Sequence, residues 1–241
     1  MLGFCLRSLV REYGWRFAAR VAAGRPLRTL KALREADRLE VTGAGVDVGA
    51  RAAWPLSGGP PSIVGVGFCV KPIDPPCPSG RANHDCRCLE TLAPHDAAGV
   101  PAPCRSCAIR DIGMRSLRAG SAFYVMTSAR DILADVYVPA IESGRFPTGL
   151  FVLCRYSFKP FAAGLLASGM RARLLPLDQG DCRDYRTWLL ADRGVKLERT
   201  TVAASGMTQA ASVLGTLGPA RAMRFERRGH VLYPATARPA P

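Results

Sequence analysis

Residues 121–177 read SAFYVMTSARDILADVYVPAIESGRFPTGLFVLCRYSFKPFAAGLLASGMRARLLPL, and this stretch repeats one pattern. Apolar runs typical of strands, at 121–128, 149–157 and 171–177, alternate with stretches whose apolar residues recur at helical spacing. The runs are continuously apolar, which is typical of parallel strands that are buried on both faces. The sequence therefore predicts an α/β protein with an open, doubly wound, mostly parallel sheet of about four or five strands.

The remaining sequence extends this plan on both sides. Residues 199–205 (RTTVAAS) are predicted to form a fourth parallel strand, and residues 224–233 (RFERRGHVLY) a terminal hairpin. Changes in composition and in the spacing of apolar residues along the chain predict three regions. These are a basic amphipathic helical segment at 1–38, a small β-containing region with a cysteine-rich, metal-binding loop insertion at 39–114, and a Rossmann-like α/β domain at 115–241.

The net charge of +14 comes mainly from arginine, with 29 Arg and only four Lys. Arginine recurs throughout the chain beside abundant Ala, Gly and Pro, which indicates a general compositional bias. Proteins dedicated to nucleic acids usually concentrate basic residues on one face or in one run. The composition therefore argues against nucleic-acid binding, while a basic surface that binds an anionic partner stays open as an alternative.

No stretch combines the length and the apolarity of a membrane-spanning helix. Pro and Gly interrupt residues 52–70, and the uncharged residues 200–220 are rich in Ser and Thr. The first residues are rich in Arg and lack the apolar core of a secretory signal. We therefore expect a cytoplasmic protein without a transmembrane segment.

Nine cysteines are the most informative feature of the composition. In the reducing cytoplasm, cysteines serve more often as metal ligands or reactive thiols than as disulfides. The region 71–108 shows no sustained periodicity, and so long a loop is usually functional or held by a ligand. Six of the nine cysteines fall within 39 residues: Cys69, Cys77, Cys86, Cys88, Cys104 and Cys107.

Cys104 and Cys107 form a Cys-x-x-Cys pair, whose turn can direct both sulfurs at one ion. Cys77 and Cys86 would complete a set of four thiolates, with Cys88 as the substitute if the register differs. Four thiolates suit an iron–sulfur cluster or tetrahedral zinc. We expect a 4Fe–4S cluster that serves a redox partner protein, with zinc as the alternative. Buried cysteines without a metal and a redox-active dithiol stay open.

The chain has three histidines, which argues against a histidine-rich metal site. His84 stands directly before Asp85 and Cys86, where it could ligate a metal or act as a base toward a thiol. A structural role, in which the polar loop residues cap turns, is the alternative. His95 has no local partner and is expected to be exposed, and His230 lies in a strand-like run.

Ligands of open α/β sheets bind beyond the carboxyl ends of the strands. Amides at helix starts and an arginine fork suit a small anion there, although ordinary helix capping is the alternative. We expect the cysteine loop to lie over these strand ends, because a helix at 106–118 leads from it into the first strand. The predicted ligand-binding residues are Thr127, Ser128, Arg155, Asp178 and Asp181.

Cys154 and Cys182 are the candidate nucleophiles among these strand ends. Cys182 is favoured because it opens a predicted helix at 181–194, whose N-terminus would stabilise a thiolate. The leading hypothesis is nevertheless a cytoplasmic metal-binding protein, with an iron–sulfur cluster in a redox or accessory role and a pocket for a small anionic ligand. The alternatives are a thiol-dependent enzyme without metal and a structural zinc protein with a basic anion-binding surface.

Overall fold

The computed structural model describes residues 25–49, 59–90, 100–215 and 225–235. The strands in these ranges form one sheet of seven strands in the order β1-β5-β4-β2-β3-β7-β6. Their bounds are β1 (Val46–Val48), β2 (Ile63–Gly67), β3 (Ala122–Met126), β4 (Thr148–Leu153), β5 (Arg171–Pro176), β6 (Phe225–Arg228) and β7 (Val231–Pro234).

The four central strands of the sheet run parallel. β2 pairs with β3 on one side and with β4 on the other, and β4 pairs with β5. The outer pairings β1–β5, β3–β7 and β6–β7 are antiparallel. The predicted α/β class is therefore confirmed. The predicted number of four or five strands is too low, and the sheet is mixed because antiparallel strands flank its parallel centre.

The prediction of a fourth parallel strand at 199–205 is wrong. Val202 forms only an isolated antiparallel bridge with Leu177, and a helix begins at Ala204. The fourth parallel strand is β2, which lies much earlier in the chain and occupies the centre of the sheet. β2 comes from the range 39–114, whereas its neighbours β3 and β4 come from 115–241, so one sheet spans both predicted regions.

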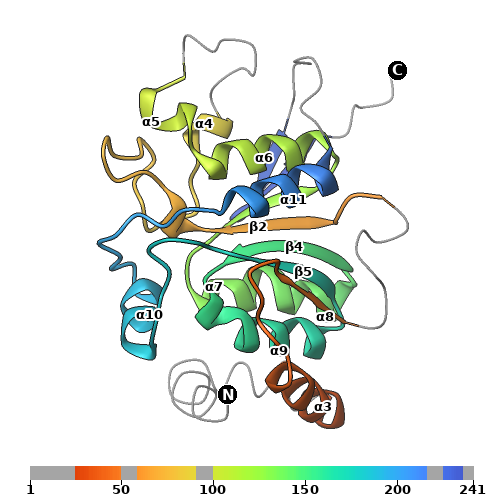
Figure 1. The fold of residues 1–241 in the computed structure, drawn as a ribbon. Coiled ribbons are helices and arrows are strands. Elements are labelled where there is room, and N and C mark those ends of the chain that lie inside the picture. The colour runs from red at the N-terminus through yellow and green to blue at the C-terminus, as the bar shows by residue number, and fades with distance from the viewer. Residues whose placement is uncertain (1–24, 50–58, 91–99, 216–224, 236–241) are drawn as a thin grey trace, which may run out of the picture.

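Helices cover both faces of the sheet (Figure 1). Each layer of helices closes over its own buried apolar cluster. One face carries α6 (Ala108–Arg118) and α11 (Ala204–Leu214), and the other carries α3 (Pro26–Asp37), α7 (Ala129–Ile132), η5 (Leu133–Tyr137), α8 (Val138–Ser143) and α9 (Phe158–Ser168). Shorter helices lie in the connections: η3 (Phe68–Val70), α4 (Arg87–Glu90), α5 (Ala102–Arg105), η6 (Arg155–Ser157) and α10 (Tyr185–Asp192).

Local sequence explains several of these elements. α9 ends where Gly169 adopts a φ of 87°, a left-handed conformation that glycine accepts without strain. α10 begins with a capping box in which Asp184 and Thr187 bond each other's backbone amides. α3 is the described part of the segment predicted at 1–38, and residues 1–24 lie outside the described ranges. α3 packs on α9, where Arg28 donates a hydrogen bond to the carbonyl of Leu166.

The order of the parallel strands creates a crevice at one edge of the sheet. The chain leaves β2 toward β3 over the face that carries α6, and it leaves β4 toward β5 over the face that carries α9. The two connections therefore diverge from the carboxyl ends of adjacent strands. Open α/β sheets bind ligands at such a divergence.

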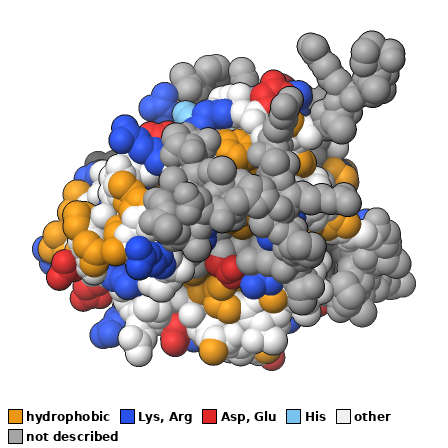
Figure 2. Space-filling view, turned by 90° about the horizontal axis from the view of Figure 1, so that it is seen from above, with side chains coloured by type: hydrophobic (Ala, Val, Ile, Leu, Met, Phe, Trp, Pro, Cys, Tyr) orange, Lys and Arg blue, Asp and Glu red, His pale blue; other side chains and the backbone are white. Residues whose placement is uncertain are grey.

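Charged side chains of both signs are interspersed with apolar ones on the face shown in Figure 2. Within the described ranges, no helix has both the length and the apolarity needed to cross a membrane.

Candidate functional site

A cavity of about 130 Å³ opens at the carboxyl ends of β2 and β4. The ends of β2, β3 and β4 form one part of its lining, and residues of α7, η5, α9 and α10 form the rest. Most of the lining is apolar, and it includes Leu133, Tyr137, Phe161 and Trp188. A cavity of roughly this size and character accommodates a ligand as small as benzene.

Three cysteines line this cavity: Cys69 after β2, Cys154 after β4 and Cys182 in the loop after β5. The Sγ atom of Cys154 lies 2.9 Å from the Oγ atom of Ser157. The Cys182 thiol interacts with the same sulfur. Ser157 and Cys182 therefore place two polar groups beside the Cys154 sulfur, an arrangement that stabilises a thiolate.

The three thiols that line the cavity differ in the direction in which their pKa values are shifted. The interaction with Cys182 is the main cause that lowers the pKa of Cys154, and together with Ser157 it outweighs the opposing effect of burial. The pKa of Cys182 is raised, first by its interaction with Cys154 and then by burial. Burial raises the pKa of Cys69 to about 11. Of the three thiols, that of Cys154 is therefore the most readily deprotonated.

The junction between β4 and α9 positions the Cys154 sulfur. β4 ends at Leu153, and η6 leads directly into α9. The backbone N–H of Ser157 donates to the carbonyl of Cys154 at 2.9 Å, and this turn holds the Ser157 hydroxyl 2.9 Å from the Cys154 sulfur. Ser157 follows Cys154 at the spacing Cys-x-x-Ser. This spacing is a sequence signal for the site that the prediction did not use.

The structure places Cys182 differently from its predicted position. α10 begins at Tyr185 with Asp184 as its N-cap, so Cys182 lies before the helix rather than in its first turn. Its thiol acts as a hydrogen-bond donor to Cys154. Of the two candidate nucleophiles, the geometry favours Cys154.

Of the five residues predicted to bind an anion, only Thr127 lines the cavity. Arg155 and Asp178 are exposed, and Asp181 is half-buried. Ser128 caps α7, and its Oγ atom accepts a hydrogen bond from a backbone amide of that helix at 3.1 Å. The apolar lining suits an apolar ligand better than an anion.

The cysteine loop does not bring its predicted ligand set to one point. Cys88 and Cys104 are joined in a disulfide, while Cys86 and Cys107 are buried and Cys77 is half-buried. In the described part of the chain, the sulfurs of Cys77, Cys86 and Cys107 do not all lie within 4.8 Å of one another. Cys104 thus has Cys88 as its partner in place of Cys107.

A buried lysine lies among these cysteines. Lys71 is 1% exposed, and its Nζ atom donates to the carbonyl oxygen and to the Oδ1 atom of Asn83 at 2.9 and 2.6 Å. Burial lowers the pKa of Lys71, and the neighbouring Cys77 and Cys86 act in the opposite direction. Burial raises the pKa of Cys86 to about 12. The loop therefore places a cation next to several thiols.

The cysteine loop lies over the carboxyl ends of β2 and β3, as predicted. The guanidinium of Arg81 donates to the carbonyl of Cys69 at 3.1 Å, just beyond β2. The Nδ1 atom of His84 lies 2.8 Å from the carbonyl oxygen of Val125 in β3, and its Nε2 atom lies 3.1 Å from the Oγ1 atom of Thr127. Thr127 also lines the cavity, so the loop and the cavity share one edge of the sheet.

Comparison of this chain with protein-family models, with curated proteins and with solved structures gave no match. The function must therefore be inferred from the geometry and chemistry of its own side chains.

Proposed function

We propose that the protein is a thiol-dependent enzyme whose nucleophile is the Cys154 thiolate and whose strand-end cavity binds a small, largely apolar substrate. The Ser157 hydroxyl 2.9 Å from the Cys154 sulfur, together with the neighbouring Cys182 thiol in the wall of the same cavity, carries this proposal. Buried structural cysteines are inert thiols with raised pKa values, as Cys86 illustrates. A buried sulfur with a lowered pKa that faces a cavity is instead typical of a reactive cysteine.

The neighbouring Cys182 thiol favours thiol–disulfide exchange as the reaction. The Cys154 sulfur attacks one sulfur of a substrate disulfide, so a mixed disulfide forms and the other substrate sulfur leaves as a thiolate. The Cys182 proton passes to this leaving group. The Cys182 sulfur then attacks Cys154, which releases the second substrate thiolate and forms a Cys154–Cys182 disulfide. Two electrons have moved to the substrate, and a reducing partner protein in the cytoplasm would restore the pair.

Alkylation with iodoacetamide tests the assigned nucleophile. Mass spectrometry of wild-type protein should show Cys154 as the fastest-labelled cysteine, with a rate that reaches half its maximum at a lower pH than that of an ordinary thiol, because the thiolate is the reacting form. Cys154→Ala should lose the fast phase and the ability to reduce a small aromatic disulfide. Cys77→Ala, which changes a half-buried cysteine outside the cavity, should retain both. Labelling of Cys154 no faster than that of Cys86 would refute the proposal.

The second candidate function is a metal centre in the cysteine loop, iron–sulfur first and zinc as the alternative. Its support is that Cys86, Cys88, Cys104 and Cys107 are all buried within one apolar cluster. The buried ammonium of Lys71 beside them would offset part of the negative charge of thiolate ligands. Cys88 and Cys104 would have to be in their reduced form to serve as ligands.

Quantification of iron, sulfide and zinc in anaerobically purified protein tests this second candidate. A stoichiometric metal content that Cys104→Ser abolishes and Cys182→Ser retains would support it. Cys104→Ser should also destabilise the loop, because metal-binding free energy contributes to folding. A metal-free protein would rule it out, and any destabilisation by Cys104→Ser would then be assigned to loss of the Cys88–Cys104 disulfide.

A further inference from the structure

His84 is held in the tautomer that a metal ligand requires. Its Nδ1 atom lies 2.8 Å from the carbonyl oxygen of Val125, so Nδ1 carries the proton and donates it. The lone pair is then on Nε2, which faces the Oγ1 atom of Thr127 at 3.1 Å and the Oδ2 atom of Asp131 at 3.5 Å. Histidines that bind metals usually donate their other ring N–H to a carbonyl or a carboxylate in this way.

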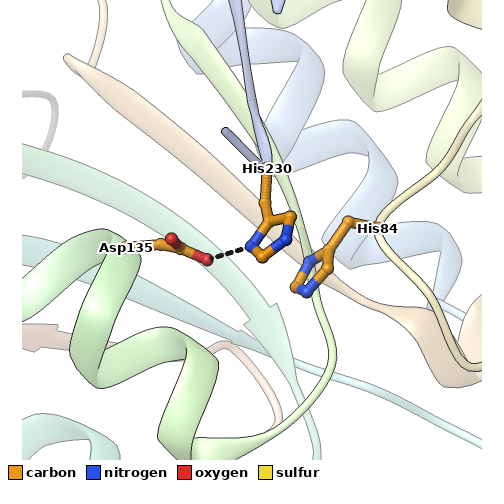
Figure 3. A group of neighbouring side chains, drawn as sticks. All are labelled: His84, Asp135 and His230. Atoms are coloured by element: carbon orange, nitrogen blue, oxygen red, sulfur yellow. Dashed lines mark hydrogen bonds and ion pairs between the residues drawn. The ribbon is translucent and has the colours of Figure 1, made fainter. Parts of the chain in front are cut away.

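Asp135 and His230 lie beside His84, although the three residues are far apart in the sequence (Figure 3). The Nδ1 atom of His230 is 2.8 Å from the Oδ2 atom of Asp135, and the Tyr124 hydroxyl donates to the same oxygen at 2.9 Å. One potential ligand atom from each of His84, Asp135 and His230 lies within 4.8 Å of the other two. Two imidazoles and a carboxylate thus converge from the cysteine loop, η5 and the β6–β7 hairpin.

We propose that His84, His230 and Asp135 form a binding site for a divalent transition-metal ion, with zinc as the best match to this ligand set. Imidazole nitrogen with carboxylate oxygen is a common zinc environment, and it is chemically distinct from the thiolates of the cysteine loop. Tyr124 bonds Asp135, and its hydroxyl would orient that carboxylate toward the ion. Asp131, which accepts a hydrogen bond from Thr127 at 2.6 Å, places a second carboxylate next to Nε2 of His84.

Metal binding requires one rearrangement within this group. The rings of His84 and His230 are stacked, with centroids 3.9 Å apart and planes inclined by 9°. A metal lies in the plane of an imidazole that ligates it, so two parallel rings do not direct both lone pairs at one ion. His84 is fixed by Val125, whereas the side chain of His230 is 48% exposed and follows the hairpin turn at Gly229. Rotation of the His230 ring would therefore complete the site while the core stays in place.

Cobalt(II) is the probe that separates this site from the thiolates, because thiolate ligands add an intense near-ultraviolet charge-transfer band that nitrogen and oxygen ligands lack. Titration of the full chain should give visible d–d absorption without that band. His230→Gln and Asp135→Asn should each weaken cobalt binding by at least about tenfold. Glu226→Gln is the matched control, since this carboxylate lies on the same hairpin but pairs with Arg228. It should bind cobalt like the wild type.

Both variants are expected to fold, because His230 is half-exposed and the amide of Asp135→Asn keeps an oxygen for the Tyr124 hydroxyl. Zinc should raise the Tm of the wild type and leave that of His230→Gln unchanged, since the ion would join the hairpin to the cysteine loop. Cobalt affinities of His230→Gln and Asp135→Asn equal to that of the wild type would overturn the proposal. Absorption that always carries the thiolate band would overturn it as well.

Discussion

Burial has opposite outcomes for two cysteines of this chain. Cys86 and Cys154 are both buried, yet the pKa of Cys86 rises to about 12 and that of Cys154 falls below its ordinary value of 9.0. Burial alone disfavours the charged form, whereas hydrogen bonds to the thiolate favour it. The donors supplied by Ser157 and Cys182 therefore decide the charge of Cys154. Cys154 therefore loses its proton at a lower pH than Cys86 does.

Replacement of Cys182 by Ala should raise the pKa of Cys154 toward its ordinary value of 9.0, because the Cys182 thiol is the strongest of the stabilising donors. The pH at which iodoacetamide labels Cys154 at half its maximal rate should move upward by the same amount. Cys77→Ala, remote from the cavity, should leave the profile in place. An unchanged profile in Cys182→Ala would contradict the role of Cys182 as donor.

Individual site residues could be predicted only where chain position alone determines their location. Cys154, Cys182 and Thr127 follow predicted strands, and all three line the cavity. Which thiol carries the charge depends on the direction of nearby N–H and S–H groups, which the sequence does not reveal. The approach of His230 to His84 depends on the packing of a hairpin against a loop that is distant in the sequence. The sequence analysis therefore argued against a histidine-rich metal site, although the folded chain brings these two histidines together.

At the scale of elements, α9 shows how one helix both packs on the sheet and shapes the cavity. Gly164 lies where a Cβ atom would come within 2.5 Å of the Cζ atom of Tyr137. The Tyr137 ring cannot easily move aside, because it is buried and its hydroxyl donates to the carbonyl of Phe161 at 3.1 Å. Glycine at this position therefore lets the ring form part of the cavity wall.

Gly164→Ala should lower the free energy of unfolding by about 1–3 kcal/mol, the usual cost of overpacking a core. A decrease in stability would be informative, because replacing Gly by Ala within a helix normally stabilises the helix by about 1 kcal/mol. Chemical denaturation would measure the change. Gly206→Ala in α11 is the control, since the atom nearest to its Cβ would be the Cγ1 atom of Val202, at 3.3 Å. Equal effects of both substitutions would contradict the steric role of Tyr137.

The strands β3, β4 and β5 could be predicted because their signals are local: continuous apolar runs bounded by helix caps and glycines. Residues 199–205 mimic such a run, but their neighbour in space is the end of β5, which allows only one bridge. The central place of β2 could not be predicted. A strand's neighbours in a sheet depend on contacts between distant segments, and a single sequence carries no record of them.

At the scale of the whole molecule, the ranges 39–114 and 115–241 contribute strands to one sheet, and the cavity and the cysteine loop lie at the same edge of it. β2 brings the range 39–114 into the centre of the sheet, and the cysteine loop that follows it covers the carboxyl ends of β2 and β3. The change in composition near residue 114 predicted a boundary between two regions. β2 precedes this boundary, yet both of its neighbours in the sheet, β3 and β4, follow it. The cavity, the cysteine loop and the histidine group consequently lie close together.

The antiparallel strands at the two edges of the sheet also influence whether the sheet can pair with other chains. β1 has three residues and β6 has four, and β6 carries Glu226, Arg227 and Arg228 in succession. Long apolar edge strands invite backbone pairing with other chains, and short charged ones discourage it. The continuously apolar strands β2, β3 and β4 thus lie between edge strands whose shortness and charge disfavour edge-to-edge pairing with other chains.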